Sequence, residues 1–420
     1  RIRVGPCLEN CVPAFNRSIR TRRAMLLCLL TAGLATPLAG AQHAHQSHKA
    51  VAKAPELGTG VAVDSHGNLW IASKEVADDG QYVVLQRSHD LGRTWSAPKR
   101  IQRQPEPVSA DGENRPKLAF GPHDELYVTY TKPLAKPYTG EIRLVRSTDG
   151  GQTFAPPLTV HANRDLIGHR FDALAVDRAG RVYVAWIDKR DLEAALARKE
   201  SYAGAAIYYA VSDDGGASFR GDYKLADHSC ECCRIALALN TEGLPVALWR
   251  HVFAPNVRDH ALAVLAPDGK PAPSMRATFD DWQVDACPHH GPALAYAEDG
   301  TRHQAWFHAK GEEGGVFYAA ATPSGVLGTP MRLGSPQAAH ADLAVRGQTV
   351  VLAWRQFDGQ STAILAKLSG DGGRTWRDAE LARTRSASDQ PHLLSTPAGI
   401  VLVWRTRQEG VRTLMAMEKE

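Results

Sequence analysis

The chain has 420 residues, of which 44% are hydrophobic, and a formal net charge of +4. This composition supports one large hydrophobic core or two ordinary ones. Residues 1–41 contain six Lys or Arg and one Glu, so residues 42–420 carry a net charge of 4 − 6 + 1 = −1. Without a basic surplus, the rest of the chain is not expected to bind nucleic acid.

The N-terminal residues have the order of a secretory signal peptide. The basic stretch RSIRTRRA precedes the apolar run MLLCLLTAGLATPLAG, and small residues follow at 39–41. The run is too short to cross a bilayer comfortably. We therefore expect 1–41 to be an upstream segment and cleaved signal peptide. The mature chain then begins near Gln42, has no transmembrane segment, and is periplasmic or secreted.

The next segment, 42–58, opens with QHAHQSH, a histidine tract of a kind that is typical of metal scavenging. It also contains KAVAKAPE at 49–56, which we expect to form a strand.

Four short segments, called Asp-boxes below, repeat one pattern: SHDLGRTW at 88–95, STDGGQTF at 147–154, SDDGGASF at 212–219 and SGDGGRTW at 369–376. The pattern predicts a tight turn between strands, in which the aspartate accepts backbone N–H bonds and glycine supplies a positive φ. We predict a structural role for the four aspartates, which are Asp90, Asp149, Asp214 and Asp371.

A longer repeat of an apolar strand, a turn and a second apolar strand occurs seven times between 59 and 420. Its spacing of about 50–60 residues is a propeller period. The strands are short and bounded by Gly, Asp and Pro, and the one good helix signal is DLEAALARKE at 191–200. We therefore predict an all-β propeller over 59–420. The seventh unit ends after its third strand, so strand 49–56 is expected to complete it and remove an open edge.

The Asp-boxes resemble the BNR repeats of the bacterial sialidase superfamily, over roughly 59–420. The resemblance implies a sialidase-like β-propeller. Propellers of that family usually have six blades, so six is the alternative to the seven counted here. The motif is specific for the fold and weak for sialidase chemistry. The strand that matches the family's first arginine motif reads TGVAVD, so enzymatic activity is left open.

The strand order of such a blade places candidate ligand-binding residues on one face. If strands A to D run outward from the channel, the Asp-boxes lie in C–D turns, and the D–A and B–C connections share the opposite face. Arginines gather at those connections: Arg115, Arg170, Arg234, Arg250, Arg355 and Arg405. Guanidinium groups bind carboxylates bidentately, so we predict a small anionic ligand or glycan at the channel mouth. The alternative is that they pair with acids of the same face, such as Asp172 and Asp389.

Cysteines form a second candidate site. Aligning ALAL at 236–239 with ALAY at 293–296 places CECCRI over CPHHGP, on neighbouring blades. Exported cysteines usually form disulfides, whereas thiolate with imidazole suits zinc or copper. We predict a Cys230–Cys287 bridge and a metal site made by Cys232, Cys233, His289 and His290. Two disulfides without a metal are the alternative.

Together these features predict an exported propeller that binds an anionic or metal-containing ligand at its channel mouth. An exo-sialidase-like glycoside hydrolase is the first alternative. A non-catalytic propeller that holds a partner protein is the second.

Overall fold

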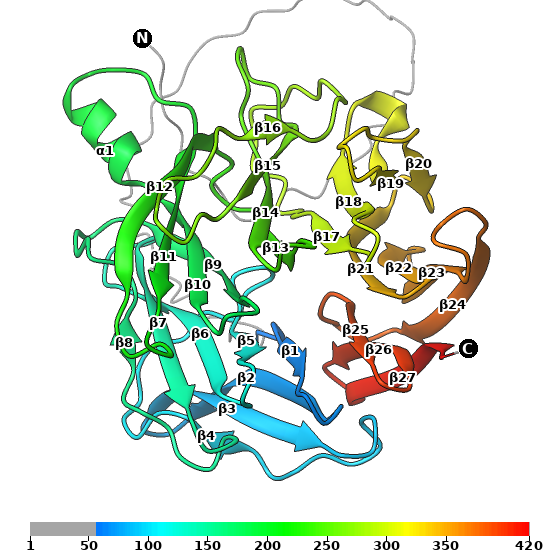
Figure 1. The fold of residues 1–420 in the computed structure, drawn as a ribbon, viewed down its shortest axis with the longest axis horizontal. Helices are drawn as coiled ribbons and strands as arrows, with labels where there is room; N and C mark the ends of the chain where they lie inside the picture. The colour runs from blue at the N-terminus through cyan, green and yellow to red at the C-terminus, as the bar shows by residue number, and fades with distance from the viewer. Residues whose placement is uncertain (1–55, 420) are drawn as a thin grey trace, which may run out of the picture. The chain divides into compact units, whose positions relative to one another are not determined.

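The computed structural model describes residues 56–419, which form seven antiparallel sheets (Figure 1). The predicted signal peptide and the histidine tract lie outside the described residues, as does all of the predicted closing strand except Glu56. No helix among residues 56–419 has both the length and the apolar composition needed to cross a membrane.

The sheets follow one another along the chain. The first three contain β1 (Gly60–Val63), β2 (Leu69–Ala77), β3 (Gly80–Ser88) and β4 (Lys99–Arg100); β5 (Lys117–Phe120), β6 (Leu126–Pro133), β7 (Gly140–Ser147) and β8 (Leu158–Thr159); and β9 (His169–Val176), β10 (Val182–Asp188), β11 (Ala205–Ser212) and β12 (Arg220–Ser229).

The fourth and fifth contain β13 (Ala236–Leu239), β14 (Pro245–Arg250), β15 (His260–Val264) and β16 (Met275–Arg276), then β17 (Ala293–Tyr296), β18 (Arg302–His308), β19 (Gly315–Ala321) and β20 (Met331–Leu333). The sixth and seventh contain β21 (Ala338–Arg346), β22 (Thr349–Phe357), β23 (Thr362–Ser369) and β24 (Arg377–Thr384), then β25 (His392–Thr396), β26 (Gly399–Thr406) and β27 (Gly410–Glu418).

The first strands of the seven sheets form the inner ring, and β25 of the last sheet lies beside β1 of the first (Figure 1). The structure is therefore a seven-bladed β-propeller. The predicted fold and blade count are confirmed, and the six-bladed alternative is wrong. The seventh sheet has three strands among the described residues.

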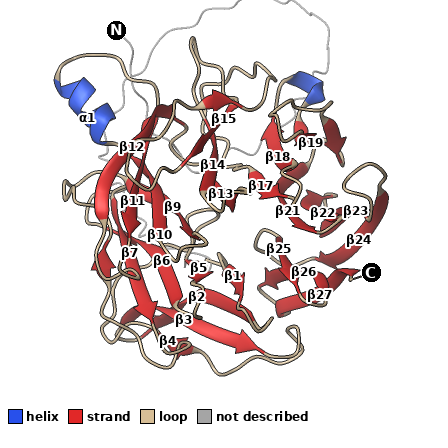
Figure 2. Cartoon of the chain, in the orientation of Figure 1, coloured by secondary structure: helices blue, strands red, loops and turns tan. Residues whose placement is uncertain are grey.

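The core lies between neighbouring sheets. All seven residues of β10 are buried, because this strand is covered on both faces. One core cluster joins Tyr127 and Leu144 of the second sheet to Val184 and Trp186 of the third. Helix is confined to α1 (Arg190–Ala197), near the predicted 191–200, and a short turn at Gly311–Glu313 (Figure 2).

Each Asp-box forms the turn between the third and fourth strands of a sheet, with one set of hydrogen bonds. In the second sheet, Oδ1 of Asp149 accepts the Thr153 N–H at 2.8 Å, and Oγ of Ser147 accepts the Gly151 N–H at 2.9 Å. Asp90, Asp214 and Asp371 accept equivalent bonds. Gly151 has a φ of 80°, which explains the glycine. The antiparallel order places these turns opposite the connections that carry the candidate sites.

Candidate functional site

Three of the six predicted arginines surround one carboxylate. Nη1 of Arg115 lies 2.8 Å from Oδ2 of Asp389. The backbone N–H of Asp389 donates to the carbonyl of Arg405 at 2.8 Å, and Arg355 lies within electrostatic range of Asp389. We call Arg115, Arg355 and Arg405 the arginine cluster. It joins the connection before β5 to the ends of β22 and β26.

The arginine cluster has a surplus of positive charge and of hydrogen-bond donors. Three guanidinium groups interact electrostatically with one carboxylate, which gives a local charge of 3 − 1 = +2. Buried N–H groups on all three have no partner among the described residues: Nη2 of Arg115, Nε of Arg355 and Nη1 of Arg405. Burial lowers the pKa values of Arg355 and Arg405, and the Asp389 charge only partly opposes it. Buried donors without acceptors are costly and call for a partner.

Both carboxylate oxygens of Asp389 already accept hydrogen bonds from the protein. Burial alone raises a carboxyl pKa, but the charge of Arg115 and the hydrogen bond with His392 hold the Asp389 pKa below its usual range. Its Oδ2 also accepts the Thr59 N–H at 3.0 Å, and its Oδ1 accepts the Gln390 N–H at 2.7 Å.

The other three predicted arginines have protein partners. Arg234 reaches across the ring, donating to the Ala341 carbonyl at 2.6 Å, and lies 3.5 Å from Glu113. Arg170 lies 3.8 Å from Asp111. Arg250 is 1% exposed and donates to backbone carbonyls. The alternative of pairing with acids therefore describes Arg115, which pairs with Asp389, as well as Arg170 and Arg234, while Arg250 is a buried cation.

Glu113 fills part of the channel mouth, and the sequence-based analysis did not single it out. This 1% exposed carboxylate accepts the backbone N–H groups of Arg234 and Gly291, each at 2.8 Å. Burial raises its pKa, but His340 and Arg234 together bring that pKa well below its usual range. Glu113 lies just before the inner strand β5, on the face where the sequence predicted ligand binding. This position could have identified it from the sequence.

The cysteines converge, although not in the predicted arrangement. Sγ of Cys230 lies 3.8 Å from Sγ of Cys232 and 3.7 Å from Sγ of Cys233, and the Cys287 thiol interacts with those of Cys230 and Cys232. Cys230, Cys232 and Cys233 have free thiols in the structure, so the Cys230–Cys287 bridge stays a prediction.

The predicted histidine ligands lie elsewhere. Among the described residues, the group whose atoms gather at metal-binding distances is Cys230, Cys232 and Cys233, without a histidine. The His290 ring stacks on Phe307 at 4.0 Å and on His340 at 4.3 Å, while His289 is exposed. The connection before β17 turns His290 toward the ring of inner strands, so the geometry does not support the mixed sulfur and nitrogen site.

One tyrosine forms a hydrogen bond with a glutamate inside the protein, an arrangement in which the glutamate could serve as a base. The Tyr130 hydroxyl donates to Glu106. Tyr130 is fully buried, and this burial, followed by the charge of Glu106, raises its pKa. A nucleophile can be activated by an adjacent base, but a hydroxyl on a side chain that is 0% exposed cannot reach a substrate. The pair therefore gives no specific support to hydrolysis.

One carboxyl near Arg250 has a raised pKa. Burial, reinforced by the charge of Asp259, raises the pKa of Asp280 to about 6. Its Oδ2 accepts the Nε1–H of Trp306 at 2.7 Å. Sequence analysis did not identify Asp280, since nothing in FDDWQ distinguishes it from Asp281.

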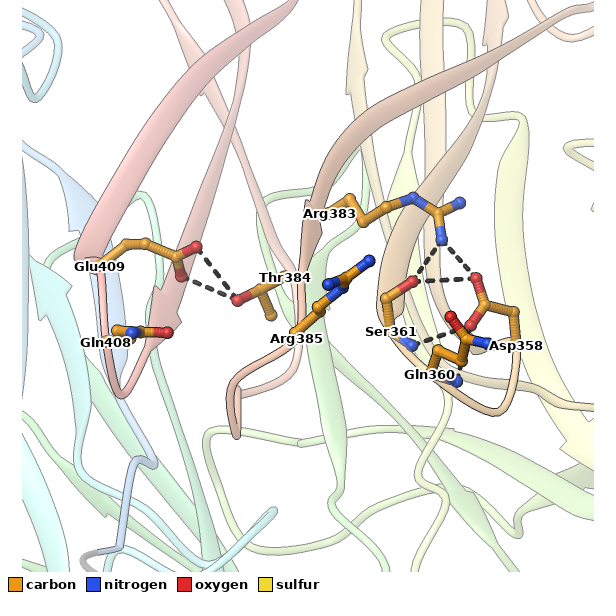
Figure 3. A pocket seen from close by; sticks show the side chains of 8 residues that line it. All are labelled: Asp358, Gln360, Ser361, Arg383, Thr384, Arg385, Gln408 and Glu409. Carbon is orange, nitrogen blue, oxygen red and sulfur yellow. Dashed lines mark hydrogen bonds and ion pairs between the residues drawn. The ribbon is translucent and has the colours of Figure 1, made fainter.

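A polar pocket of about 610 Å³ lies on the same face, between connections of the sixth and seventh sheets (Figure 3). Its lining residues are Asp358, Gln360, Ser361, Arg383, Thr384, Arg385, Gln408 and Glu409. Arg383 bonds Asp358 and Ser361, and Thr384 donates to Glu409 at 2.9 Å. Most of its charges are therefore satisfied within the protein.

No family model and no curated protein matches the sequence. Among solved structures, the chain is similar to a polysaccharide lyase, an ulvan lyase, bound to -[GlcA(1-4)Rha3S]-, with 11% identity, a TM-score of 0.54, and coverage of 86% of this chain and 94% of that one. The NanB sialidase from Streptococcus pneumoniae matches with 8% identity, a TM-score of 0.45, and coverage of 72% and 65%. At these identities the similarity is one of fold.

Proposed function

We propose that the chain is a binding propeller that holds an anionic ligand at its channel mouth through the arginine cluster. The observation that carries the proposal is the set of three buried N–H groups without acceptors, beside a local charge of +2. An anion supplies both the missing acceptors and the missing negative charge. Its hydrogen bonds are charge-assisted, which makes them stronger than neutral ones.

The ligand class that fits best is a saccharide with a carboxylate or sulfate group. Planar guanidinium groups match the oxygen geometry of such groups. The fold is also one in which a saccharide site occurs, since the similar ulvan lyase is bound to a saccharide containing GlcA. The signal-like N-terminus supports an exported setting, where free glycans are met.

The test is isothermal titration of the purified chain with N-acetylneuraminate, glucuronate and inorganic sulfate. We expect at least one to bind, with an affinity that falls as salt rises. Arg355→Met and Arg405→Met should each weaken binding at least tenfold, which is about 1.4 kcal/mol. Arg93→Gln, an exposed change in an Asp-box on the opposite face, is the control and should leave binding unchanged.

Two results contradict the proposal: no binding of any of the three probes, or equal loss in the Arg93→Gln control. Arg355→Met has a second expected effect that does not need a known ligand. Removing one of three cations that face a single carboxylate should leave the melting temperature of the ligand-free chain unchanged or raised. A large fall would mean that Arg355 is a structural residue.

A further inference from the structure

Three sulfur atoms form a compact group inside the protein. Cys230, Cys232 and Cys233 are 0%, 6% and 2% exposed, and they come from the connection between β12 and β13. Their ligand atoms all lie within 4.8 Å of one another. Cys287 is half-buried and comes from the connection between β16 and β17, 54 positions after Cys233.

The two distances from Cys230 match a metal–thiolate geometry. Zinc binds sulfur at about 2.3 Å, and the edge of a tetrahedron of that radius is about 3.8 Å. Sγ of Cys230 lies 3.8 Å and 3.7 Å from its two neighbours. A disulfide instead requires about 2.05 Å and a single partner. Cys230 is almost equally close to two sulfur atoms. The arrangement therefore fits one metal ion shared by the three sulfurs better than a disulfide between two of them.

Cys287 stands where a fourth ligand is needed. Its thiol interacts with the Cys230 and Cys232 thiols, on the side of the group nearer to solvent. The connection that carries it has irregular backbone, so a small movement of Cys287 toward the other three completes the set.

A buried cation beside the sulfurs supplies an independent observation. Arg250 is 1% exposed and forms no ion pair with any carboxylate in the described part of the chain, and its Nε has no hydrogen-bond partner there. Its guanidinium donates to the carbonyls of Arg258, His290 and Phe307. Its positive charge acts on Cys230 and Cys233. A buried arginine needs negative charge near it, and thiolates would add to the charge of the Asp280 carboxyl, on which Arg250 also acts.

From this geometry we infer that Cys230, Cys232, Cys233 and Cys287 bind one thiophilic d10 cation, Zn²⁺ or Cu⁺, as thiolates. Zn²⁺ displaces four protons from four thiols and leaves a complex of charge 4 × (−1) + 2 = −2, which the adjacent Arg250 partly neutralises. Three of the four cysteines are buried, and the site joins two connections, as structural thiolate sites do. It is separate from the arginine cluster and does not depend on the anionic ligand.

The experiment uses the full chain, reduced and handled without oxygen. Co²⁺ serves as a spectroscopic substitute for Zn²⁺, and Cu⁺ is added against a competing chelator. We expect one ion per chain, a thiolate-to-metal charge-transfer band, and displacement of Co²⁺ by whichever ion the site prefers. Alkylation followed by peptide mass analysis should show that the bound ion protects all four cysteines.

Cys287→Ser is the most informative variant, because Cys287 is the least buried of the four and its loss should leave the metal-free fold intact. We expect at least tenfold weaker metal binding with an unchanged metal-free melting temperature. His289→Ala, an exposed neighbour two positions away, is the matched control and should bind metal normally.

Failure of the reduced wild-type chain to bind Co²⁺, Zn²⁺ or Cu⁺ overturns the inference. It is also overturned if His289→Ala loses the metal while Cys287→Ser keeps it, since that result restores the mixed sulfur and nitrogen site. The alkylation measurement is made on the wild-type chain, so a variant that fails to fold does not leave the question open.

Discussion

Nη1 of Arg115 lies 2.8 Å from Oδ2 of Asp389, although 274 positions separate the two residues. Both side chains are 4% exposed. Oδ2 of Asp389 also accepts the backbone N–H of Thr59, which directly precedes β1. One carboxylate therefore links the beginnings of the seventh, first and second sheets, where the ring of inner strands closes.

Asp389→Asn should destabilise the protein strongly. The substitution leaves three arginines without their shared negative charge, and breaking a buried ion pair costs about 3–5 kcal/mol. We expect a loss of this size in the free energy of unfolding, measured by urea denaturation. The control is Asp378→Asn, whose 76% exposed side chain pairs with Lys367. It should cost less than about 1 kcal/mol.

Sulfate offers a second readout for the same variant. If the arginine cluster binds anions, added sulfate should raise the melting temperature of Asp389→Asn more than that of the wild-type chain. An unfolding free energy within about 1 kcal/mol of the wild type would show that Asp389 does not hold the ring together.

Glu113→Gln should also be destabilising, and its effect should depend on pH. The amide retains one acceptor oxygen but turns a donor toward the N–H groups of Arg234 and Gly291, at an expected cost of about 2–4 kcal/mol at neutral pH. The folded pKa of Glu113 is lowered, so its contribution is complete above the unfolded pKa of about 4.3 and disappears as pH falls through the folded value. Urea denaturation at several pH values should show that the difference in unfolding free energy between Glu113→Gln and the wild type becomes smaller as pH falls. A difference that does not change with pH contradicts the prediction.

Asp149→Ala tests whether an Asp-box is structural. The change removes the acceptor for the Thr153 N–H and hydroxyl groups, both within 2.8 Å. Thermal unfolding should shift down by a few degrees, while anion affinity per folded molecule stays the same, because the turn lies on the opposite face. Weaker binding in a variant that melts normally would mean that the Asp-box takes part in recognition.

Features encoded in contiguous residues could be read from the sequence, whereas contacts across the ring could not. An Asp-box specifies its own turn within eight residues, and the seven strand pairs repeat at a regular interval, so the fold and blade count followed. The partner of Arg115 is 274 positions away, and no local pattern distinguishes Arg115, which forms an ion pair with a carboxylate, from Arg250, which forms none within residues 56–419.

The cysteine site also was only partly predictable from the sequence. Aligning two inner strands placed Cys287 near Cys230, because the strands occupy equivalent positions in neighbouring sheets. The alignment could not give the path of the irregular connection beyond it. That path turns His290 onto Phe307 and leaves Cys287 near the other sulfurs.

The Asp280 carboxyl should make the protein less stable as pH rises, opposite to the usual behaviour of an acid. Burial, with the nearby charge of Asp259, raises its folded pKa to about 6, while the unfolded pKa is about 3.9. Between these values the folded state holds more protons than the unfolded state, so the free energy of unfolding falls with rising pH. The charges of Arg250 and Lys310 oppose the shift without cancelling it. Above about pH 6 the full penalty applies.

Asp280→Asn removes this penalty and keeps an oxygen that accepts the Trp306 N–H. A shift of about two pKa units corresponds to about 2–3 kcal/mol, so the variant should be more stable than the wild type by this amount near pH 8 and equal to it near pH 4. Asp281→Asn is the matched control. This neighbour is 65% exposed, and its hydrogen bond with Arg276 lowers its pKa, so its substitution should slightly destabilise the protein at neutral pH. The measurement is the free energy of unfolding of the three proteins by urea denaturation between about pH 4 and pH 8. An Asp280→Asn variant that is less stable than the wild type near pH 8 would show that the charged carboxylate is stabilising.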